Sequence, residues 1–566
     1  MPHVVVRRGV ALGFALAVCA TGLHAQAPAG NPLDRLPAPQ PIAPTAGQAP
    51  RVDVQAPPGP AGDVLQRRFT VRRVDVEGVA ALPFADIAGL FAPFAGQEAS
   101  VAQLVAAAGQ GTAAYRDRGF ALSFVFLPQQ DFADGVVRVV AVEGYIADVR
   151  IEGDVGPAEP KLRAMAQALQ GERPLRLERF ERVTQLLARL PGITMAAEAA
   201  RPSTTGGATT LVLRARRKPY NVTLGADLRQ PRSRAVLSGV LNDPFAPGSE
   251  LSASTLAGDF RREKLLTLGY TQFVGIDGLA LKAAFTRYSG YPDAQNGRGS
   301  AIERFNTNRR LEFSGSYPLM LRAASSLTLS GGFYAVDNTD DYRVQASGAQ
   351  LSEDTRVRAL FAQLAYAETR ADRSRAASLM LAQGLDGAGA LARNRSNVAG
   401  LAGPGSARLD FTRLLLEASQ RDRYANQWGT GFSFAAQHSP HPLAASERIS
   451  FGGPRFGRGY APGDAAGDAG WGIGLELNRM FRMEGNWLKQ VEPYLLLEAA
   501  RTRLHARSVA QGPQKLRSVA LGIRLSDAKR YSLDLAVAKP TGDATSTNPN
   551  RRARLSVLLA WQLEPQ

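Results

Sequence analysis

The residues with the clearest potential for chemistry lie in a glycine-rich segment, ISFGGPRFGRGY, at positions 449–460. Within it, Gly457 and Gly459 flank Arg458, and Tyr460 follows. A planar guanidinium can hold a carboxylate by two parallel hydrogen bonds, and flanking glycines permit a close backbone approach that a side chain would block. The segment could therefore anchor a loop through an arginine–carboxylate contact, although a solvated arginine on a surface loop fits the same residues.

Two glutamates further along the chain are candidate acidic partners for Arg458. An arginine in a partly desolvated space is costly unless a carboxylate pairs with it. Glu498 lies in an alternating stretch and shares one face with Leu496 and Ala500. Glu476 lies in the preceding alternating segment and is a competing candidate. The sequence leaves both partners open.

Other catalytic and ligand-binding patterns are weak or missing in the sequence. His438 and His441 form an isolated pair in a Pro-containing stretch, with no cysteine or third ligand nearby, which favours a surface loop over a metal site. The chain has no Gly-x-Ser-x-Gly elbow and no Gly-Lys-Ser/Thr phosphate loop. We therefore expect no catalytic residues, no enzymatic activity, no cofactor and no metal site.

The glycine-rich segment lies within a long tract, residues 218–566, in which apolar and polar residues alternate. A tilted membrane strand needs about 9–11 residues, and alternation leaves no long apolar run. The tract therefore predicts a membrane β-barrel of about 16 antiparallel strands. An array of soluble β-sandwiches is the alternative, but no second period marks separate domains. The expected strands begin near Tyr220, Ala235, Glu250, Lys264, Leu279, Arg304, Ser325, Thr355, Ser374, Leu409, Trp428, Trp471, Glu492, Leu516, Tyr531 and Arg551.

Upstream of this tract, one order of elements occurs twice. The first copy, residues 67–145, has a strand that ends in Glu77-Gly78, then two helical stretches and two further strands. The second copy, residues 146–217, repeats the β-α-α-β-β order, and its first strand also ends in Glu-Gly. One such unit would indicate only a small mixed domain. Two tandem copies of similar length predict a repeated α+β module.

The N-terminal region has the features of an exported protein. Arg7 and Arg8 precede an apolar run that is too short to span a bilayer, and small residues follow near Ala25. We therefore expect a signal peptide at residues 1–25, which contains the only cysteine, Cys19. Export argues against nucleic acid as the partner of the formal charge of +17.

Residues 26–66 are expected to form a Pro-rich linker. Ten prolines fall between Pro28 and Pro60, a composition that favours an extended and semi-rigid chain over a packed helix. At most, residues 31–36 could form a helical turn.

The order of signal peptide, Pro-rich stretch, two modules and barrel resembles the outer-membrane transporters of two-partner secretion. These are the haemolysin and filamentous-haemagglutinin exporters, whose modules are called polypeptide-transport-associated (POTRA) domains. The family's Val-Arg-Gly-Tyr/Phe motif on the sixth extracellular loop is similar to residues 457–460, with glycine in place of valine. The resemblance implies that this loop folds into the barrel lumen. There its arginine would contact the acidic residue of a Phe-x-Asp-x-Gly motif on the thirteenth strand, which corresponds to Glu498.

The resemblance also implies a function and a location. The barrel would lie in the outer membrane, in contact with its lipid, and the POTRA modules in the periplasm. The modules would bind an unfolded haemolysin-like or adhesin-like exoprotein, which the barrel would pass to the cell surface. One rival is a factor of the same superfamily that inserts other barrels, and another is a diffusion porin. Family members often carry an N-terminal plug helix, which the Pro-rich stretch could hardly supply.

Overall fold

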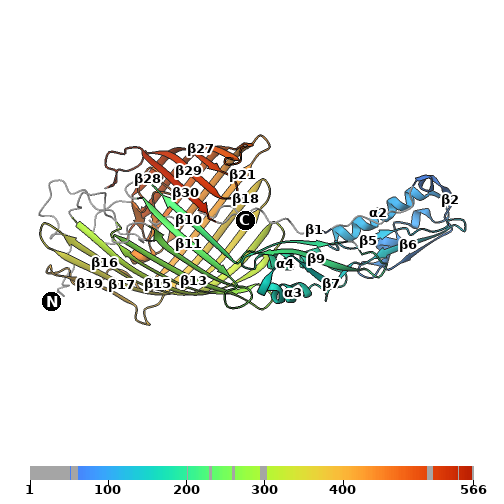
Figure 1. Cartoon of the computed structure of the whole chain (residues 1–566), viewed down its shortest axis with the longest axis horizontal. Coiled ribbons are helices and arrows are strands. Elements are labelled where there is room, and N and C mark those ends of the chain that lie inside the picture. Colours follow the sequence, from blue (N-terminus) through green and yellow to red (C-terminus); the bar gives the residue numbers. More distant parts are fainter. Residues whose placement is uncertain are drawn as a thin grey trace, which may run out of the picture.

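The computed structural model describes residues 33, 51–52, 62–200, 202–228, 233–257, 262–292, 302–505, 514–545 and 547–563. The expected signal peptide lies outside these residues, as do most of the linker and all but one residue of the stretch where a turn was expected. Among the residues described, no helix is long and apolar enough to cross a membrane. Figure 1 shows the two modules in a row, extending from one end of a barrel. We call this the module end of the barrel and the opposite one the far end.

The first module packs two helices on a small sheet of strand order β3-β6-β5. The longer helix, α2, begins after Ser100, whose hydroxyl accepts the N–H of Gln103 while the Gln103 side chain accepts the N–H of Ser100. This capping box satisfies two of the free donors at the helix start. The elements are β2 (Arg68–Thr70), β3 (Arg73–Glu77), α1 (Phe84–Ala88), β4 (Glu98–Ser100), α2 (Val101–Asp117), β5 (Phe124–Phe126) and β6 (Val136–Val142).

A buried tyrosine ties helix α2 of the first module to the end of its sheet. The Tyr115 hydroxyl donates to Glu143 over 2.8 Å, and the same carboxylate oxygen accepts the N–H groups of Ala80 and Ala81. Burial, followed by the hydrogen bond to Glu143, raises the pKa of Tyr115, so the hydroxyl stays protonated as a donor. The module thus has a core of its own, which includes Ile87, Leu104, Tyr115, Val137 and Val139.

The second module repeats the pattern and adds one short strand from the linker. Its sheet has the order β1-β8-β9-β7, in which β1 runs parallel to β8. Helix α4 buries Phe180, Val183 and Leu187 against this sheet. The predicted β-α-α-β-β order is confirmed in both modules. The elements are β1 (Arg51–Val52), β7 (Tyr145–Glu152), α3 (Glu159–Gln167), α4 (Leu177–Ala188), β8 (Ile193–Ala199) and β9 (Ala208–Arg217).

The alternating tract forms a closed antiparallel barrel, which β10 and β30 seal by pairing from Thr223↔Gln562 to Asp227↔Leu558. In the part of the chain described, sixteen long strands make the wall, as predicted, and three short segments (β19, Leu391–Ser396; β20, Gly403–Pro404; β26, Phe481–Arg482) extend it. The long strands are β10 (Tyr220–Asp227), β11 (Arg234–Asn242), β12 (Ser249–Ala257), β13 (Glu263–Val274), β14 (Leu279–Gly290), β15 (Ile302–Leu321), β16 (Ser325–Val344), β17 (Gln350–Thr369), β18 (Arg373–Gly384), β21 (Thr412–Arg423), β22 (Trp428–His438), β25 (Ala469–Arg479), β27 (Gln490–Arg503), β28 (Lys515–Ser526), β29 (Tyr531–Pro540) and β30 (Arg554–Gln562).

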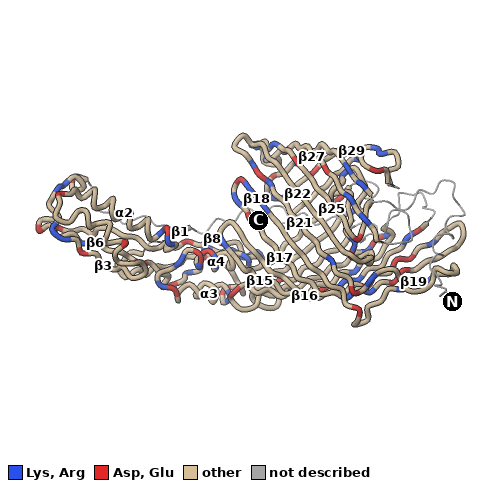
Figure 2. Tube along the Cα trace, turned by 180° about the vertical axis from the view of Figure 1, so that it is seen from behind, with Lys and Arg blue, Asp and Glu red and all other residues tan. Residues whose placement is uncertain are grey.

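Alternation gives the barrel an apolar outer face. On β27 and β28, Leu497 and Leu521 are 46% and 64% exposed, whereas the neighbouring Glu498 and Ala520 are buried. This is the pattern of a strand with lipid on one side and a polar lumen on the other. Figure 2 shows long stretches without charge along the wall, with charged positions toward the far end and in the modules.

The second module is held against a strand end and a turn at the module end of the barrel. Arg182 on α4 donates to the carbonyl of Pro318 over 3.1 Å and to the hydroxyl of Tyr317 over 3.0 Å. Arg217 at the end of β9 pairs with the buried Asp243 over 3.1 Å. The C-terminal end of the second module therefore lies directly against the module end of the barrel.

Candidate functional site

The connection between β22 and β25, residues 439–468, folds into the barrel, and we call it the inner loop. It contains a two-stranded ribbon of β23 (Ile449–Phe451) and β24 (Ala465–Gly467). Phe451 and Tyr460 are fully buried and pack with inward residues of the wall, among them Ala500 and Leu516. Residues 449–460 are thus part of a packed lumen, and the surface-loop alternative does not hold.

Two glycines let the tip of the inner loop lie flat against the wall. Gly457 has a φ of 143°, a conformation that other residues rarely adopt. A Cβ atom on Gly459 would lie 2.7 Å from the backbone nitrogen of Pro540 on β29. The glycines that flank Arg458 therefore allow the close approach that brings its side chain to the wall.

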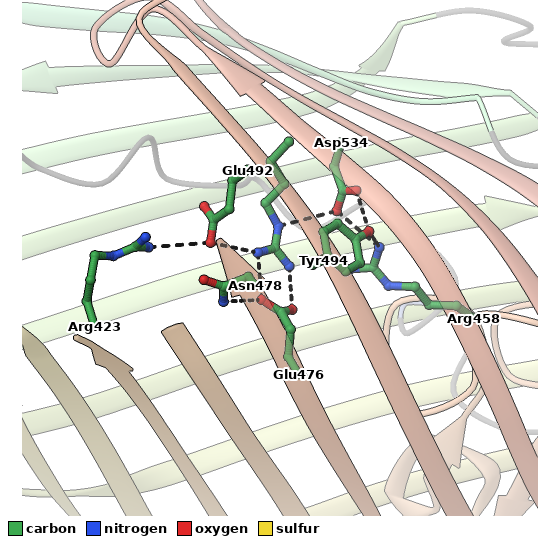
Figure 3. Close-up of polar contacts among 8 residues, drawn as sticks. Arg423, Arg458, Glu476, Asn478, Glu492, Tyr494 and Asp534 are labelled. Atoms are coloured by element: carbon green, nitrogen blue, oxygen red, sulfur yellow. Dashed lines mark hydrogen bonds and ion pairs between the residues drawn. The ribbon is translucent and has the colours of Figure 1, made fainter. Parts of the chain in front are cut away.

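Arg458 is anchored twice at this point. Its backbone N–H donates to Glu498 on β27 over 2.7 Å, while its guanidinium donates to Asp534 on β29 over 3.1 Å and to the hydroxyl of Tyr494. Tyr494 in turn donates to Asp534 over 2.6 Å, and the guanidinium lies 5.4 Å from the Tyr494 ring centre. Asp534 and Arg458 have side chains only 8% and 14% exposed, so each charge depends on the other (Figure 3).

A second arginine continues the network along the inner wall of the barrel. Arg524 on β28 forms two hydrogen bonds with Glu476, at 2.5 and 2.7 Å, and lies 4.2 Å from the Tyr494 ring centre. It also approaches Glu492 at 3.6 Å, and Glu492 pairs with Arg423 at 3.4 Å. Figure 3 shows this row of alternating charges leading from Arg423 to Arg458.

The structure separates the two glutamates proposed from the sequence. Glu498 contacts the loop through the backbone of Arg458 and also accepts a hydrogen bond from Ser518 over 2.7 Å. Glu476 holds Arg524, and the guanidinium of Arg458 reaches Asp534, which was not among the residues predicted from the sequence. The alternation of inward and outward residues could have identified Asp534, because it is the one acidic residue at the inward positions of its strand.

Two further contacts hold the inner loop away from its tip. Asp464 accepts hydrogen bonds from the hydroxyls of Thr545 and Thr547, at 3.0 and 2.6 Å. At the base of the loop, Glu447 accepts from the Tyr334 hydroxyl over 2.7 Å and pairs with Arg413 at 3.3 Å. The loop is therefore attached to both sides of the barrel, through β27–β29 and through β16 and β21.

The two histidines lie at the end of β22 toward the far end of the barrel and in the loop that follows it. His441 accepts the backbone N–H of Thr412 over 3.2 Å, and His438 is exposed at the end of β22. Within the described ranges, no group of three His, Cys, Asp or Glu residues is arranged to hold a metal ion.

Two family models match separate parts of the chain. That of the ShlB-type POTRA domain matches residues 69–144, and that of the haemolysin secretion/activation protein family ShlB/FhaC/HecB matches residues 266–525. Together they cover more than half of the sequence. The chain belongs to this family.

Both curated relatives and two of the matching solved structures are named CdiB. The chain is 28% identical over 217 residues to the outer membrane transporter CdiB of Escherichia coli, a match that covers 36% of this chain and 37% of the relative. Matches to curated relatives span 14% to 37% of their lengths. The solved structure of CdiB from E. coli matches with a TM-score of 0.65 at 18% identity, over 92% of this chain and 94% of that one. BamA from Haemophilus ducreyi, lacking POTRA domains 1–3, matches with a TM-score of 0.51 at 13% identity, over 87% and 100%.

Membership of the ShlB/FhaC/HecB family gives the molecule its orientation. The barrel lies in the outer membrane and the POTRA modules lie in the periplasm, as predicted. The far end of the barrel is therefore extracellular. The inner loop joins the eleventh and twelfth long strands at that end, which makes it the sixth extracellular loop.

Proposed function

We propose that this protein is a passive, non-catalytic channel that exports one unfolded exoprotein, of haemolysin or adhesin type, by two-partner secretion. The architecture supports this function because the second POTRA module ends at the barrel entrance, where Arg182 and Arg217 hold it. A client bound on the modules would need no further carrier to reach the lumen.

The pairing of β1 with β8 suggests how an extended client could bind. An extended segment of the linker already adds to the edge of the second module's sheet, with Arg51 opposite Glu198 and Val52 opposite Ala199. Backbone pairing at a sheet edge gives affinity with little sequence demand, which suits a client that must stay unfolded. We therefore propose the β8 edge as a docking position for the exoprotein, reached when β1 leaves it.

The observation that carries the proposal is the inner loop fixed in the conduit through Arg458. A channel for an unfolded chain needs an element that narrows its lumen when no client is present. The ion pair between Arg458 and Asp534 holds the inner loop in such a position. We expect Arg458→Ala to leave a folded, heat-modifiable barrel but to reduce export sharply. The measurement is the amount of exoprotein on the cell surface and in the medium.

Arg455→Ala is the matched control in the same loop. Arg455 pairs with Glu417 over 2.7 Å, but its side chain is 34% exposed and lies outside the network around Asp534. Export should therefore persist in this variant. Wild-type secretion by Arg458→Ala would contradict the assignment of the inner loop.

Deletion of the gene separates export from the rival functions. Loss of one large exoprotein, such as one encoded by a neighbouring reading frame, would support export. General loss of outer-membrane barrels would instead indicate an assembly factor, and impaired uptake of small solutes would indicate a porin.

A further inference from the structure

The lipid-facing side of β27, β28 and β29 carries a group of cations at the extracellular end. Antiparallel pairing sets Arg501 on β27 opposite Lys515 on β28. The other members continue the same outward rows, two residues further along β27 and β28 and on the adjacent strand β29. All five side chains are exposed. We call them the outer basic patch: Arg501, Arg503, Lys515, Arg517 and Lys539.

Strand parity shows that the patch faces the membrane side of the wall. Val519 and Val537 are 39% and 53% exposed, and Arg517 and Lys539 follow the same parity, two residues closer to the extracellular end. Two strand residues correspond to about 7 Å, so these cations lie directly beyond the apolar belt. The outward row therefore changes here from apolar to charged residues, as expected at the level of the lipid headgroups.

The cations of the patch have no acidic partner in the described part of the chain. None of the five takes part in an ion pair there. Asp543, at the edge of the patch, accepts the backbone N–H of Lys515 over 2.9 Å rather than pairing with its ammonium group. Two arginines elsewhere at the extracellular end do have acidic partners, since Arg358 pairs with Asp337 at 2.8 Å and Arg395 with Asp354 at 2.6 Å.

Such an arrangement is unfavourable for an isolated protein. Like charges directly opposite on neighbouring strands repel, as Arg501 and Lys515 do. The repulsion becomes attraction when an anion lies between them, and arginine in particular binds phosphate through two parallel hydrogen bonds. A phosphorylated lipid would present that anion at this depth, with its acyl chains against the valines and leucines below.

We propose that the outer basic patch binds the phosphate groups of the lipopolysaccharide in the outer leaflet of the outer membrane. The site requires only the outer-membrane location and does not depend on the proposed export. Its acyl-chain surface is the apolar row beneath the patch, which includes Leu497, Val519, Leu521 and Val537.

The test compares full-length protein with a triple variant, Arg501→Gln, Lys515→Gln and Arg517→Gln, in lipid nanodiscs. Binding of lipopolysaccharide is titrated, with lipopolysaccharide lacking its lipid A phosphates and inorganic phosphate as further probes. Since each cation near an anionic lipid surface contributes favourably, we expect binding to the triple variant to be at least about tenfold weaker. Full-length protein should bind the dephosphorylated lipid as weakly as the triple variant binds the native one.

The matched control removes the same charge from paired arginines at the extracellular end: Arg358→Gln, Arg395→Gln and Arg408→Gln. It should bind lipopolysaccharide like the unaltered protein. Equal losses in both triple variants, equal binding of the dephosphorylated lipid, or equally tight binding of inorganic phosphate alone would overturn the proposal. So would unchanged lipid binding accompanied by loss of exoprotein capture, which would make the patch a client surface. Heat-modifiable migration of each variant confirms that its barrel is folded.

Discussion

The inner and outer faces of β27–β29 carry charge in opposite ways. On the inner face, Glu498 and Asp534 are buried and bound to the inner loop through Arg458. On the outer face, a few residues away along the same strands, Arg501 and Lys515 are exposed members of the outer basic patch. The same strands therefore hold a neutralised network toward the lumen and an uncompensated one toward the lipid.

The difference between the faces follows from strand parity and from the cost of burying charge. An ion removed from water loses several kcal/mol of solvation unless a partner replaces the lost interactions. Arg458 therefore needs Asp534, and Arg524 needs Glu476. The outward cations keep contact with solvent and headgroups instead. The inner charges hold the inner loop in place, whereas the outer basic patch remains available to a ligand.

The largest effect should come from breaking the inner network at its shared carboxylate. Asp534→Ala leaves Arg458 without its ion pair and removes one neighbour of Arg524. Removal of one partner of a buried pair costs about 3–5 kcal/mol, so we expect a loss of that order in the free energy of unfolding. Urea unfolding of the refolded barrel in detergent measures it. Asp410→Ala, at an exposed ion pair with Arg408, is the control and should be close to neutral.

A smaller effect is expected from pushing the loop tip off the wall. In Gly459→Ala, the new methyl group would lie 2.7 Å from the backbone nitrogen of Pro540, which cannot move freely within β29. Overpacking of this kind costs about 1–3 kcal/mol and should expose the inner loop to protease. Gly387→Ala is the control, because nothing lies within 4 Å of its added atom. Equal protease resistance in both variants would show that the loop tip can accommodate the added methyl group without moving.

Glu476→Gln should weaken the network less than the loss of Asp534. Arg524 would keep Glu492 at 3.6 Å and Asp534 at 3.9 Å, and glutamine can still accept one of its hydrogen bonds. We expect a loss of about 1–2 kcal/mol in the free energy of unfolding, because glutamine keeps part of an interaction that is worth about 1.5–3 kcal/mol for a hydrogen bond to a charged group. A loss as large as that of Asp534→Ala would mean that Glu476, and not Asp534, carries the network.

Much of the fold could be predicted because the sequence repeats simple periods. Alternation identified all sixteen long strands, with expected starts such as Tyr220, Ser325 and Trp428 coinciding with the observed ones. The three strands β15–β17 are each 20 residues long, beyond what a bilayer requires. The expected starts of β17, β21 and β30 lie three to five residues from the observed ones. Alternation does not indicate where lipid ends and solvent begins, so strand length is harder to predict than strand number.

The candidate site was predictable in its loop but not in its contacts. Arg458 and its glycines stand out in the sequence, whereas Asp534 is 76 residues away, on a different strand from the one the resemblance indicated. Which inward carboxylate meets the guanidinium depends on how the inner loop lies across three strands. That position is set by tertiary packing around Phe451 and Tyr460, which no local pattern encodes.

The smallest effect on stability is expected on the outer face. The triple variant Arg501→Gln, Lys515→Gln and Arg517→Gln removes three exposed cations that have no ion pair in the described part of the chain. In detergent without lipopolysaccharide, the free energy of unfolding should change by less than about 0.5 kcal/mol, as for other surface substitutions. Relief of the repulsion between Arg501 and Lys515 would even favour a slight gain.

Addition of lipopolysaccharide should then stabilise the unaltered protein more than the triple variant, because a ligand that binds only the folded state raises its stability. Urea unfolding with and without the lipid measures the difference. A large loss in detergent alone would show that the outer cations, like the inner ones, hold the barrel together.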